Sequence, residues 1–192
     1  MAENLRFLSA FLRSPLSIGA IAPSSRWLAA RMVEGMDLET AETVVELGPG
    51  TGAFTGAILE HLGPESRYMA VELNEEFARR LRAARPDLHV VHDSAERLAE
   101  HLAAAGRAHA DSIICGLPWA SFPKQLQERI MSSTMQSLRS GGRFATFAYV
   151  HAAWLPTARR FRRFLEAHFT EVRTTPVVWR NLPPAFVYRC TK

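Results

Sequence analysis

The regular alternation of strand-like and helix-like segments is the feature that most constrains this fold. From residue 43 onward, five short apolar runs have the length of buried strands, at 43–47, 67–73, 88–92, 111–117 and 143–150. Four segments with helical periodicity separate them, at 55–62, 75–84, 95–105 and 123–138. Strands that alternate with helices imply right-handed crossovers, so we expect an α/β fold with a parallel sheet covered by helices on both faces.

The end of the chain adds a helix and two more strands. Helical periodicity at 157–168 is followed by strand-like runs near 171–178 and 185–191, with the short stretch RNLPP between the two runs. Such a short connection predicts a hairpin, in which the last strand is antiparallel to its neighbour. We therefore expect a sheet of seven strands that is mostly parallel and whose last strand runs antiparallel.

The first expected strand runs into the stretch ELGPGTGA at 46–53, where glycines stand at every second position. A glycine turn between a strand and a helix exposes backbone N–H groups, and it lets a ligand approach where a side chain would block it. The pattern Gly48-x-Gly50-x-x-Ala53 satisfies the dinucleotide-binding fingerprint. A nicotinamide or flavin enzyme therefore stays open on these residues alone.

The longer stretch VVELGPGTG at 44–52 resembles motif I of the class I S-adenosylmethionine-dependent methyltransferases, whose fold is Rossmann-like. The resemblance implies that S-adenosylmethionine is the cofactor. It also implies that Glu46 helps to orient the methionine portion of the cofactor. The glycines that would let the loop pass close to the cofactor are Gly48, Gly50 and Gly52.

Acidic residues at the ends of the next two strands fit the same family. By the resemblance, Glu72 accepts hydrogen bonds from both ribose hydroxyls, with Leu73 next to it in the cofactor site. Asp93, followed by Ser94, accepts from the adenine amino group. The dehydrogenase alternative also needs a place for a second, substrate-binding domain, and this chain ends with its first sheet. We therefore favour a methyltransferase over a dehydrogenase.

The fourth expected strand runs into CGLPWASFP at 115–123, which resembles motif IV of the amino-methylating enzymes. In that motif an Asn or Asp, two prolines and an aromatic residue hold an adenine amino group. Here Gly116, which we also place at the cofactor, replaces the Asn or Asp, while Pro118 and Trp119 keep the pattern. The missing amide argues against adenine methylation, so we do not expect a nucleic-acid partner. An enzyme similar to the rRNA adenine N6-dimethylases stays an alternative.

The stretch GAIAPSS at 19–25, together with GLPWASFP, resembles the bacterial phospholipid N-methyltransferases. Those enzymes methylate phosphatidylethanolamine in up to three steps towards phosphatidylcholine. The resemblance implies the same lipid as the methyl acceptor here, with a small soluble amine as the alternative. We divide the chain into an N-terminal helical segment at 1–35, a candidate membrane contact or lid, and an S-adenosylmethionine-binding domain at 36–192.

Basic charge is concentrated towards the ends of the chain, which agrees with a phospholipid partner. Residues 139–192 carry ten basic and two acidic side chains, whereas residues 36–138 carry nine basic and fifteen acidic ones. Leucines at helical spacing within 5–13 predict a short basic amphipathic helix able to lie at an anionic membrane surface. A second basic amphipathic segment, at 158–169, is needed to cover the sheet, and its arginines are also candidates to face lipid phosphates.

Three polar residues are candidates to contact the lipid phosphate: Ser24, Ser25 and Arg180. The two serines also fit the N-cap of a helix expected at 24–34.

Aromatic residues after the fourth and fifth strands are candidates for the acceptor site. We expect Trp119 and Tyr149 to wall this site and to stabilise the cationic head group and its methylated products by cation–π contact. Tyr149 or His151 would take the proton that the ammonium group must lose. Both follow the fifth strand, near the carboxyl edge of the sheet where ligands bind in such folds.

The remaining features of the sequence indicate the cellular compartment in which we expect the protein. The apolar stretches are too short for a membrane span, and the N-terminus has no signal-peptide pattern. Cys115 and Cys190 lie in apolar runs and are expected to be buried thiols, and no metal-ligand spacing is present, so we expect no metal. We expect a cytoplasmic enzyme that associates peripherally with the inner face of the cell membrane. The sequence makes no prediction of the oligomeric state.

Overall fold

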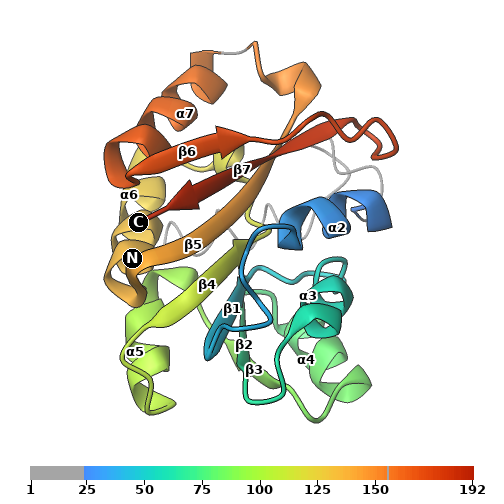
Figure 1. The fold of residues 1–192 in the computed structure, drawn as a ribbon, viewed down its shortest axis with the longest axis vertical. Coiled ribbons are helices and arrows are strands. Elements are labelled where there is room, and N and C mark those ends of the chain that lie inside the picture. The colour runs from blue at the N-terminus through green and yellow to red at the C-terminus, as the bar shows by residue number, and fades with distance from the viewer. Residues whose placement is uncertain (1–23, 155) are drawn as a thin grey trace.

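The structure is a computed structural model, and it describes residues 24–154 and 156–192 (Figure 1). Seven strands form one sheet in the order β3-β2-β1-β4-β5-β7-β6. The strands are β1 (Thr43–Leu47), β2 (Arg67–Glu72), β3 (His89–His92), β4 (Ala110–Cys115), β5 (Leu138–Tyr149), β6 (Glu171–Thr174) and β7 (Ala185–Thr191). Only β7 runs antiparallel, to both β5 and β6. The predicted α/β fold with an antiparallel last strand is therefore confirmed.

Helices cover both faces of the sheet (Figure 1). One face carries α2 (Arg26–Val33), α3 (Thr55–His61) and α4 (Glu75–Ala84), and the other carries α5 (Leu98–Ala104), α6 (Lys124–Ser137) and α7 (Pro156–His168). The described residues also form three single 3-10 turns: η2 (Ala95–Arg97), η3 (Trp119–Ser121) and η4 (Val150–Ala152). The core is divided by the sheet, because successive side chains of a strand point to opposite faces.

The strand β6 is shorter than the sequence predicts. It ends at Thr174. Beyond it, the Thr175 N–H donates to the Val187 carbonyl at 2.9 Å, and an isolated bridge joins Val178 and Ala185. Pro176 lies in this interval and has no N–H group to donate to a ladder. The connection between β6 and β7 therefore spans residues 175–184 instead of the five residues RNLPP.

The helix α2 belongs to the same core as the sheet. Its residues Leu28 and Met32 are fully buried and pack in one cluster with Val44, Ile58 and Val187. The Ser25 hydroxyl caps the helix by accepting a hydrogen bond from the Leu28 N–H at 3.2 Å, as predicted for the serine pair. Because α2 is so deeply packed, the predicted division at residue 35 does not separate it from the sheet. Residues 1–23 lie outside the described part of the chain.

The helix α7 buries its apolar side. Phe161 and Leu165 are buried against the sheet, whereas Arg159, Arg160 and Arg163 are exposed. The apolar face of this helix is therefore used by the core of the protein and is closed to lipid. Within residues 24–154 and 156–192, no helix combines the length and the hydropathy needed to cross a bilayer.

Candidate active site

The glycine loop after β1 has a backbone that only glycine adopts readily. Gly48, Gly50 and Gly52 have φ angles of 70°, 55° and 83°, in the left-handed region. No described heavy atom lies within 4 Å of the position that a Cβ on Gly50 would take. The loop therefore turns sharply and leaves open space at its centre, as a loop that a cofactor approaches closely requires.

The carboxylate of Glu72, at the end of β2, is tied to this loop. Its Oε2 accepts a hydrogen bond from the Gly50 N–H at 2.9 Å, and its Oε1 accepts one from the Asn74 N–H at 2.8 Å. Burial raises the pKa of the Glu72 carboxyl, and these backbone hydrogen bonds oppose the rise. An ionised carboxylate has about four acceptor positions, so each oxygen keeps capacity for one ribose hydroxyl.

Glu46 is the last residue but one of β1, and its side chain is fully buried. Its Oε2 accepts hydrogen bonds from the Thr55 hydroxyl at 2.7 Å and from the Tyr68 hydroxyl, while its Oε1 has no partner among the residues that the structure describes. Burial raises the pKa of Glu46 to about 7, although both hydrogen bonds lower it in part. A buried oxygen without a partner is costly and marks a place where a polar group of a ligand fits.

Asp93, after β3, is held by two basic residues. Its Oδ2 accepts hydrogen bonds from Arg97 Nη1 and from His101 Nε2, each at 2.9 Å, and its Oδ1 accepts one from the Ser94 N–H at 2.7 Å. We did not predict these partners from the sequence. Their spacing of four residues, from Asp93 to Arg97 to His101, was the available signal, because such residues share one side of a helix.

One cavity of about 150 Å³ brings the predicted cofactor residues together. Seven of the nine line it: Gly48, Gly50, Glu72, Leu73, Asp93, Ser94 and Gly116. Glu46 and Gly52 do not. Leu117, Pro118, Phe122 and Ile130 supply apolar walls, as a flat purine ring requires. Of these four, only Pro118 was singled out by sequence reasoning, although Phe122 lies in the same stretch.

Gly116 has a steric reason for replacing the Asn or Asp of the amino-methylating motif. A Cβ at this position would lie 2.8 Å from the Gly48 carbonyl oxygen, which is closer than real Cβ contacts come. The Gly116 N–H donates to the Leu47 carbonyl at 2.8 Å, so the ends of β1 and β4 are fixed against each other. A larger residue at position 116 therefore requires the glycine loop to move.

Trp119 does not occupy the position expected of an acceptor-site wall. Its side chain is 2% exposed and lies in the core on the α5–α7 face of the sheet. Its ring stacks on Phe161 at 5.3 Å between centroids and meets Phe144 edge-on at 6.5 Å. Because these phenylalanines cover the indole, the predicted cation–π contact of Trp119 with a head group does not fit the structure.

Tyr149 and His151 lie together at the end of β5. Their rings stack with centroids 5.6 Å apart, and Tyr149 also meets Phe147 edge-on. Tyr149 packs against the α2–α4 face, opposite to Trp119, and neither Tyr149 nor His151 lines the cofactor cavity. Burial raises the pKa of the Tyr149 hydroxyl, whereas His151 is exposed. The structure therefore joins two of the three predicted acceptor-site residues and separates the third.

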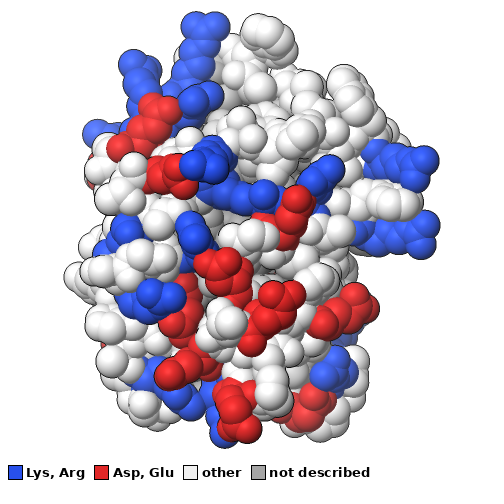
Figure 2. Space-filling model, in the orientation of Figure 1, with Lys and Arg blue, Asp and Glu red and all other residues white. Residues whose placement is uncertain are grey.

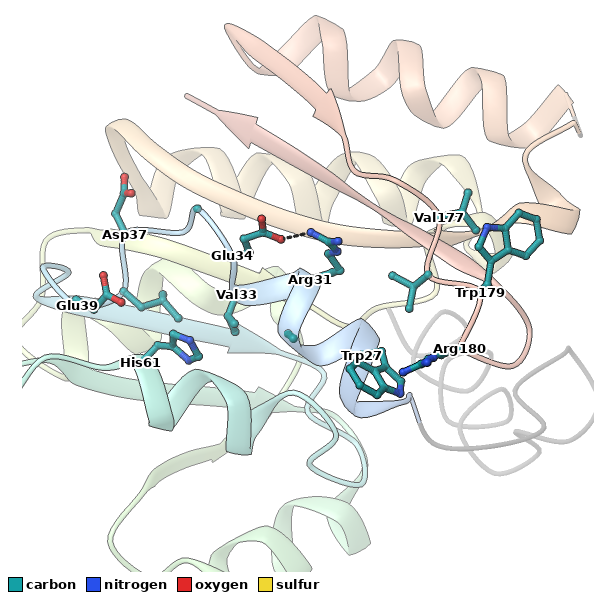
Figure 3. A pocket seen from close by; sticks show the side chains of 14 residues that line it. Trp27, Arg31, Val33, Glu34, Asp37, Glu39, His61, Val177, Trp179 and Arg180 are labelled. Atoms are coloured by element: carbon teal, nitrogen blue, oxygen red, sulfur yellow. Dashed lines mark hydrogen bonds and ion pairs between the residues drawn. The ribbon is translucent and has the colours of Figure 1, made fainter.

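The phosphate candidates also come together. The Ser25 N–H donates to Asn181 Oδ1 at 2.8 Å, which joins the start of α2 to the β6–β7 connection, and Arg180 lies in this connection beside Trp27 (Figure 3). Ser24 immediately precedes the same helix cap. The Val150 N–H donates to the Pro184 carbonyl at 2.9 Å, so this group adjoins the end of β5.

Metal-ligating side chains do not gather in the described part of the chain. No group of three or more His, Cys, Asp or Glu is arranged to hold a metal ion within residues 24–154 and 156–192. Cys115 and Cys190 are buried free thiols, as the sequence predicts.

Comparisons with known proteins agree with this geometry. Residues 44–142 match the family described as methyltransferase domain. An O-methyltransferase from Bacillus cereus, solved in complex with SAH, superposes with a TM-score of 0.64 at 15% identity, over 99% of this chain and 91% of that one. A TehB-like SAM-dependent methyltransferase from Corynebacterium glutamicum gives 0.64 at 14% identity, over 100% and 98%. The chain belongs to the class I S-adenosylmethionine-dependent methyltransferases, and S-adenosylmethionine is its cofactor.

Two proteins with assigned names are similar to this chain in sequence. The chain is 36% identical over 193 residues to a protein of Singulisphaera acidiphila named ornithine lipid N-methyltransferase, over 99% of this chain and 96% of the relative. It is also 36% identical over 81 residues, 42% of this chain, to a protein-L-isoaspartate O-methyltransferase of Ignicoccus hospitalis. The first similarity extends over both chains, whereas the second is confined to part of them.

Proposed function

We propose that this enzyme transfers a methyl group to the amine of a membrane lipid, and that phosphatidylethanolamine and its methylated derivatives are the acceptors, towards phosphatidylcholine. The observation that carries the proposal is the similarity, over nearly the whole of both chains, to a protein named for N-methylation of a lipid. The grouping of Ser24, Ser25 and Arg180 beside the carboxyl edge of the sheet supports a phosphate-bearing acceptor. Ornithine lipid is the second candidate, which the same relative favours.

The residues around the cavity hold the cofactor in this proposal. Glu72 binds the ribose hydroxyls, and Asp93, kept in place by Arg97 and His101, receives the adenine amino group. Glu46, whose Oε1 has no partner among the described residues, is the residue that we propose to orient the methionine portion. S-adenosylmethionine supplies the methyl group when bound. Positioning of the amine in line with it accounts for most of the acceleration, since alignment contributes about 7 to 11 kcal/mol in well-oriented reactions.

The acceptor nitrogen must lose a proton before it can attack. Because burial raises the pKa of Tyr149, its hydroxyl stays protonated near neutral pH and is a poor base. His151, whose imidazole is exposed and stacked on that ring, is therefore the proposed proton acceptor, with Tyr149 as the residue that orients it. The acceptor then enters above the carboxyl ends of β4 and β5.

A location at the membrane is part of the proposal. We place the enzyme in the cytoplasm, peripherally associated with the inner face of the cell membrane, where its lipid acceptor lies. The basic amphipathic helix that the sequence predicts at 5–13 falls outside the described residues, so a contribution from it to membrane contact stays a prediction.

Transfer of radiolabel from S-adenosylmethionine tests the proposal. The enzyme is incubated in parallel with phosphatidylethanolamine vesicles, ornithine lipid vesicles, ethanolamine and rRNA. We expect label in the organic phase of the phosphatidylethanolamine reaction. Label in ornithine lipid alone would identify ornithine lipid as the acceptor in place of phosphatidylethanolamine, and the acceptor would still be a membrane lipid. Label confined to rRNA or ethanolamine would refute a lipid acceptor and support the dimethylase-like or small-amine alternative.

A further inference from the structure

The large apolar side chains that the described residues expose are few and belong to three segments. They are Trp27 at 40% exposure, Trp154 at 79%, Trp179 at 73% and Leu182 at 69%. We call these four residues the tryptophan rim. A soluble protein rarely exposes several indole rings in one region, so this rim calls for a ligand or a partner.

Hydrogen bonds join the three segments that carry the rim. The contact between Ser25 and Asn181 fixes the start of α2 to the β6–β7 connection, and the contact between Val150 and Pro184 fixes that connection to the turn before α7. In Figure 1, α2 lies at the right of the view, the β6–β7 connection lies above it, and the turn that follows β5 lies towards the top. Together with the two hydrogen bonds, this arrangement places the rim along the carboxyl edge of the sheet.

Two arginines accompany Trp27. The guanidinium carbons of Arg26 and Arg180 each lie 4.6 Å from the centroid of its ring. Neither arginine forms an ion pair with any described residue, whereas Arg31, one turn further along α2, pairs with Glu34 at 2.6 Å (Figure 3). In Figure 2 two basic projections flank an uncharged area at the right of the view, where α2 lies. These cations are held by an indole and remain available to an anion.

The chemistry of this surface matches the head-group region of a bilayer. Tryptophan concentrates at membrane interfaces, because its ring is apolar and its N–H is polar. Arginine binds phosphate in a planar, bidentate way while its stem covers apolar surface. Each basic residue near an anionic membrane surface raises the binding affinity about fivefold. Exposed indoles, together with guanidinium groups that have no ion-pair partner among the described residues, suit contact with phospholipid head groups.

We propose that the tryptophan rim, with Arg26 and Arg180, docks the enzyme on an anionic phospholipid bilayer. The inference rests on the proposed lipid acceptor, because a membrane lipid must be reached at its own surface. With the rim at the head-group level, the carboxyl edge of the sheet faces the bilayer. The head-group amine then reaches the end of β5 while the acyl chains stay in the membrane.

Vesicle binding tests this docking surface. The full-length enzyme is sedimented with vesicles of phosphatidylglycerol and phosphatidylcholine, without any acceptor lipid. The double variant Trp27→Ala/Trp179→Ala is expected to bind roughly tenfold or more weakly, because two indoles no longer enter the interface. The double variant Arg26→Ala/Arg180→Ala is expected to bind roughly 30-fold more weakly, with a smaller loss in high salt.

Two controls separate docking from folding and from charge in general. Arg79→Ala/Arg80→Ala on α4 removes the same charge from another region and is expected to bind within about threefold of the wild type. Since Trp179 is largely exposed, Trp179→Ala alone is expected to fold normally by circular dichroism and still to weaken binding. Binding of the tryptophan variants at the wild-type level would overturn the proposal. If the tryptophan variants lose self-association but still bind vesicles, the proposal is overturned as well, and the rim is a protein interface.

Activity measurements distinguish this proposal from the proposed function. Methylation of a short-chain, dispersed phosphatidylethanolamine should be unchanged in Trp179→Ala, which leaves Trp27 and Arg180 in place, while methylation of the same head group in vesicles should fall with binding. If no lipid is methylated but the wild type still binds vesicles through the rim, the proposed acceptor is refuted and the docking surface stands. If dispersed and vesicle lipids are methylated equally by wild type and variant, the acceptor stands and the docking surface is refuted.

Discussion

Glu72 accepts a hydrogen bond from the Gly50 N–H at 2.9 Å, so the end of β2 holds the middle of the glycine loop that follows β1. The same carboxylate accepts a hydrogen bond from the N–H of Asn74, the residue that caps the start of α4. One side chain thereby orders the two backbone segments that border the position proposed for the cofactor ribose.

Replacement of Glu72 by Gln should weaken cofactor binding. An amide group cannot accept from both the Gly50 and the Asn74 N–H groups, and it lacks the negative charge that strengthens such bonds. Hydrogen bonds to charged groups contribute about 1.5 to 3 kcal/mol, so the dissociation constant for S-adenosylmethionine should rise roughly 10- to 100-fold. Titration calorimetry measures this constant, and an unchanged value would show that Glu72 does not bind the ribose.

Glu46 should make the enzyme less stable as the pH rises. The pKa of Glu46 is raised in the folded state from its ordinary value of 4.5 to about 7. Between these pH values the folded protein binds the proton and the unfolded chain has released it, so stability is greatest at the acidic end and falls towards neutral pH. The loss amounts to about 3 kcal/mol once the pH exceeds 7.

The variant Glu46→Gln isolates this contribution. Its free energy of unfolding in urea should exceed that of the wild type by more at pH 8 than at pH 5, because the variant has no buried charge to form. A pH-independent difference between variant and wild type would show that Glu46 has an ordinary pKa.

Gly116→Ala should disturb the cofactor site. The added methyl group would lie 2.8 Å from the Gly48 carbonyl oxygen, which is a backbone atom with little freedom to move. We expect a loss of about 1 to 3 kcal/mol in stability and weaker cofactor binding. Gly56→Ala is the matched control, since no described atom lies within 4 Å of its added methyl group and alanine favours the helix. Equal behaviour of the two variants would contradict the steric argument.

His151→Ala should lower turnover without changing cofactor affinity. A general base contributes about 100-fold or more, so the turnover number should fall by at least that factor. Tyr149→Phe should retain most of the turnover, because phenylalanine keeps the ring that stacks on His151. Full activity of the His151 variant with the lipid acceptor would assign proton removal to another group or to water.

Trp119 should behave as a core residue. Trp119→Ala leaves a large cavity between Phe144 and Phe161 and should cost about 3 to 5 kcal/mol of stability. Trp119→Phe fills most of this space, and we expect it to retain turnover with little change in the Michaelis constant for the lipid. A large rise of that constant in a folded Trp119→Phe protein would restore the cation–π role.

Local pattern and the family resemblance sufficed for the sheet and for most of the residues that line the cavity proposed to hold the cofactor. Glu72 and Asp93 were predictable because parallel strands bring their carboxyl ends to one edge, so residues distant in sequence meet there. The position of Trp119 was not predictable, since it depends on Phe161 of α7, and no local rule states which face of the sheet that helix covers. The early end of β6 had a local signal in Pro176, which the strand-like residues around it obscured.

The tryptophan rim had no signal of its own in the sequence. Exposed and buried indoles are indistinguishable by composition, and only the packed structure separates Trp179 from Trp119. Arg180 was a candidate for phosphate, but its contact with Trp27 joins segments from opposite ends of the chain.

The absence of a side chain at Gly116, where a Cβ would lie 2.8 Å from the Gly48 carbonyl oxygen, also bears on how many methyl groups one nitrogen can receive in the proposed reaction. An amide or carboxylate at position 116 would accept hydrogen bonds from the acceptor N–H groups, and each methylation would remove one of them. Affinity for the product of one step, which is the substrate of the next, would then decline. A glycine has no such bond to lose, so under the proposed function the unmethylated, monomethylated and dimethylated amines would meet the same surface at this position.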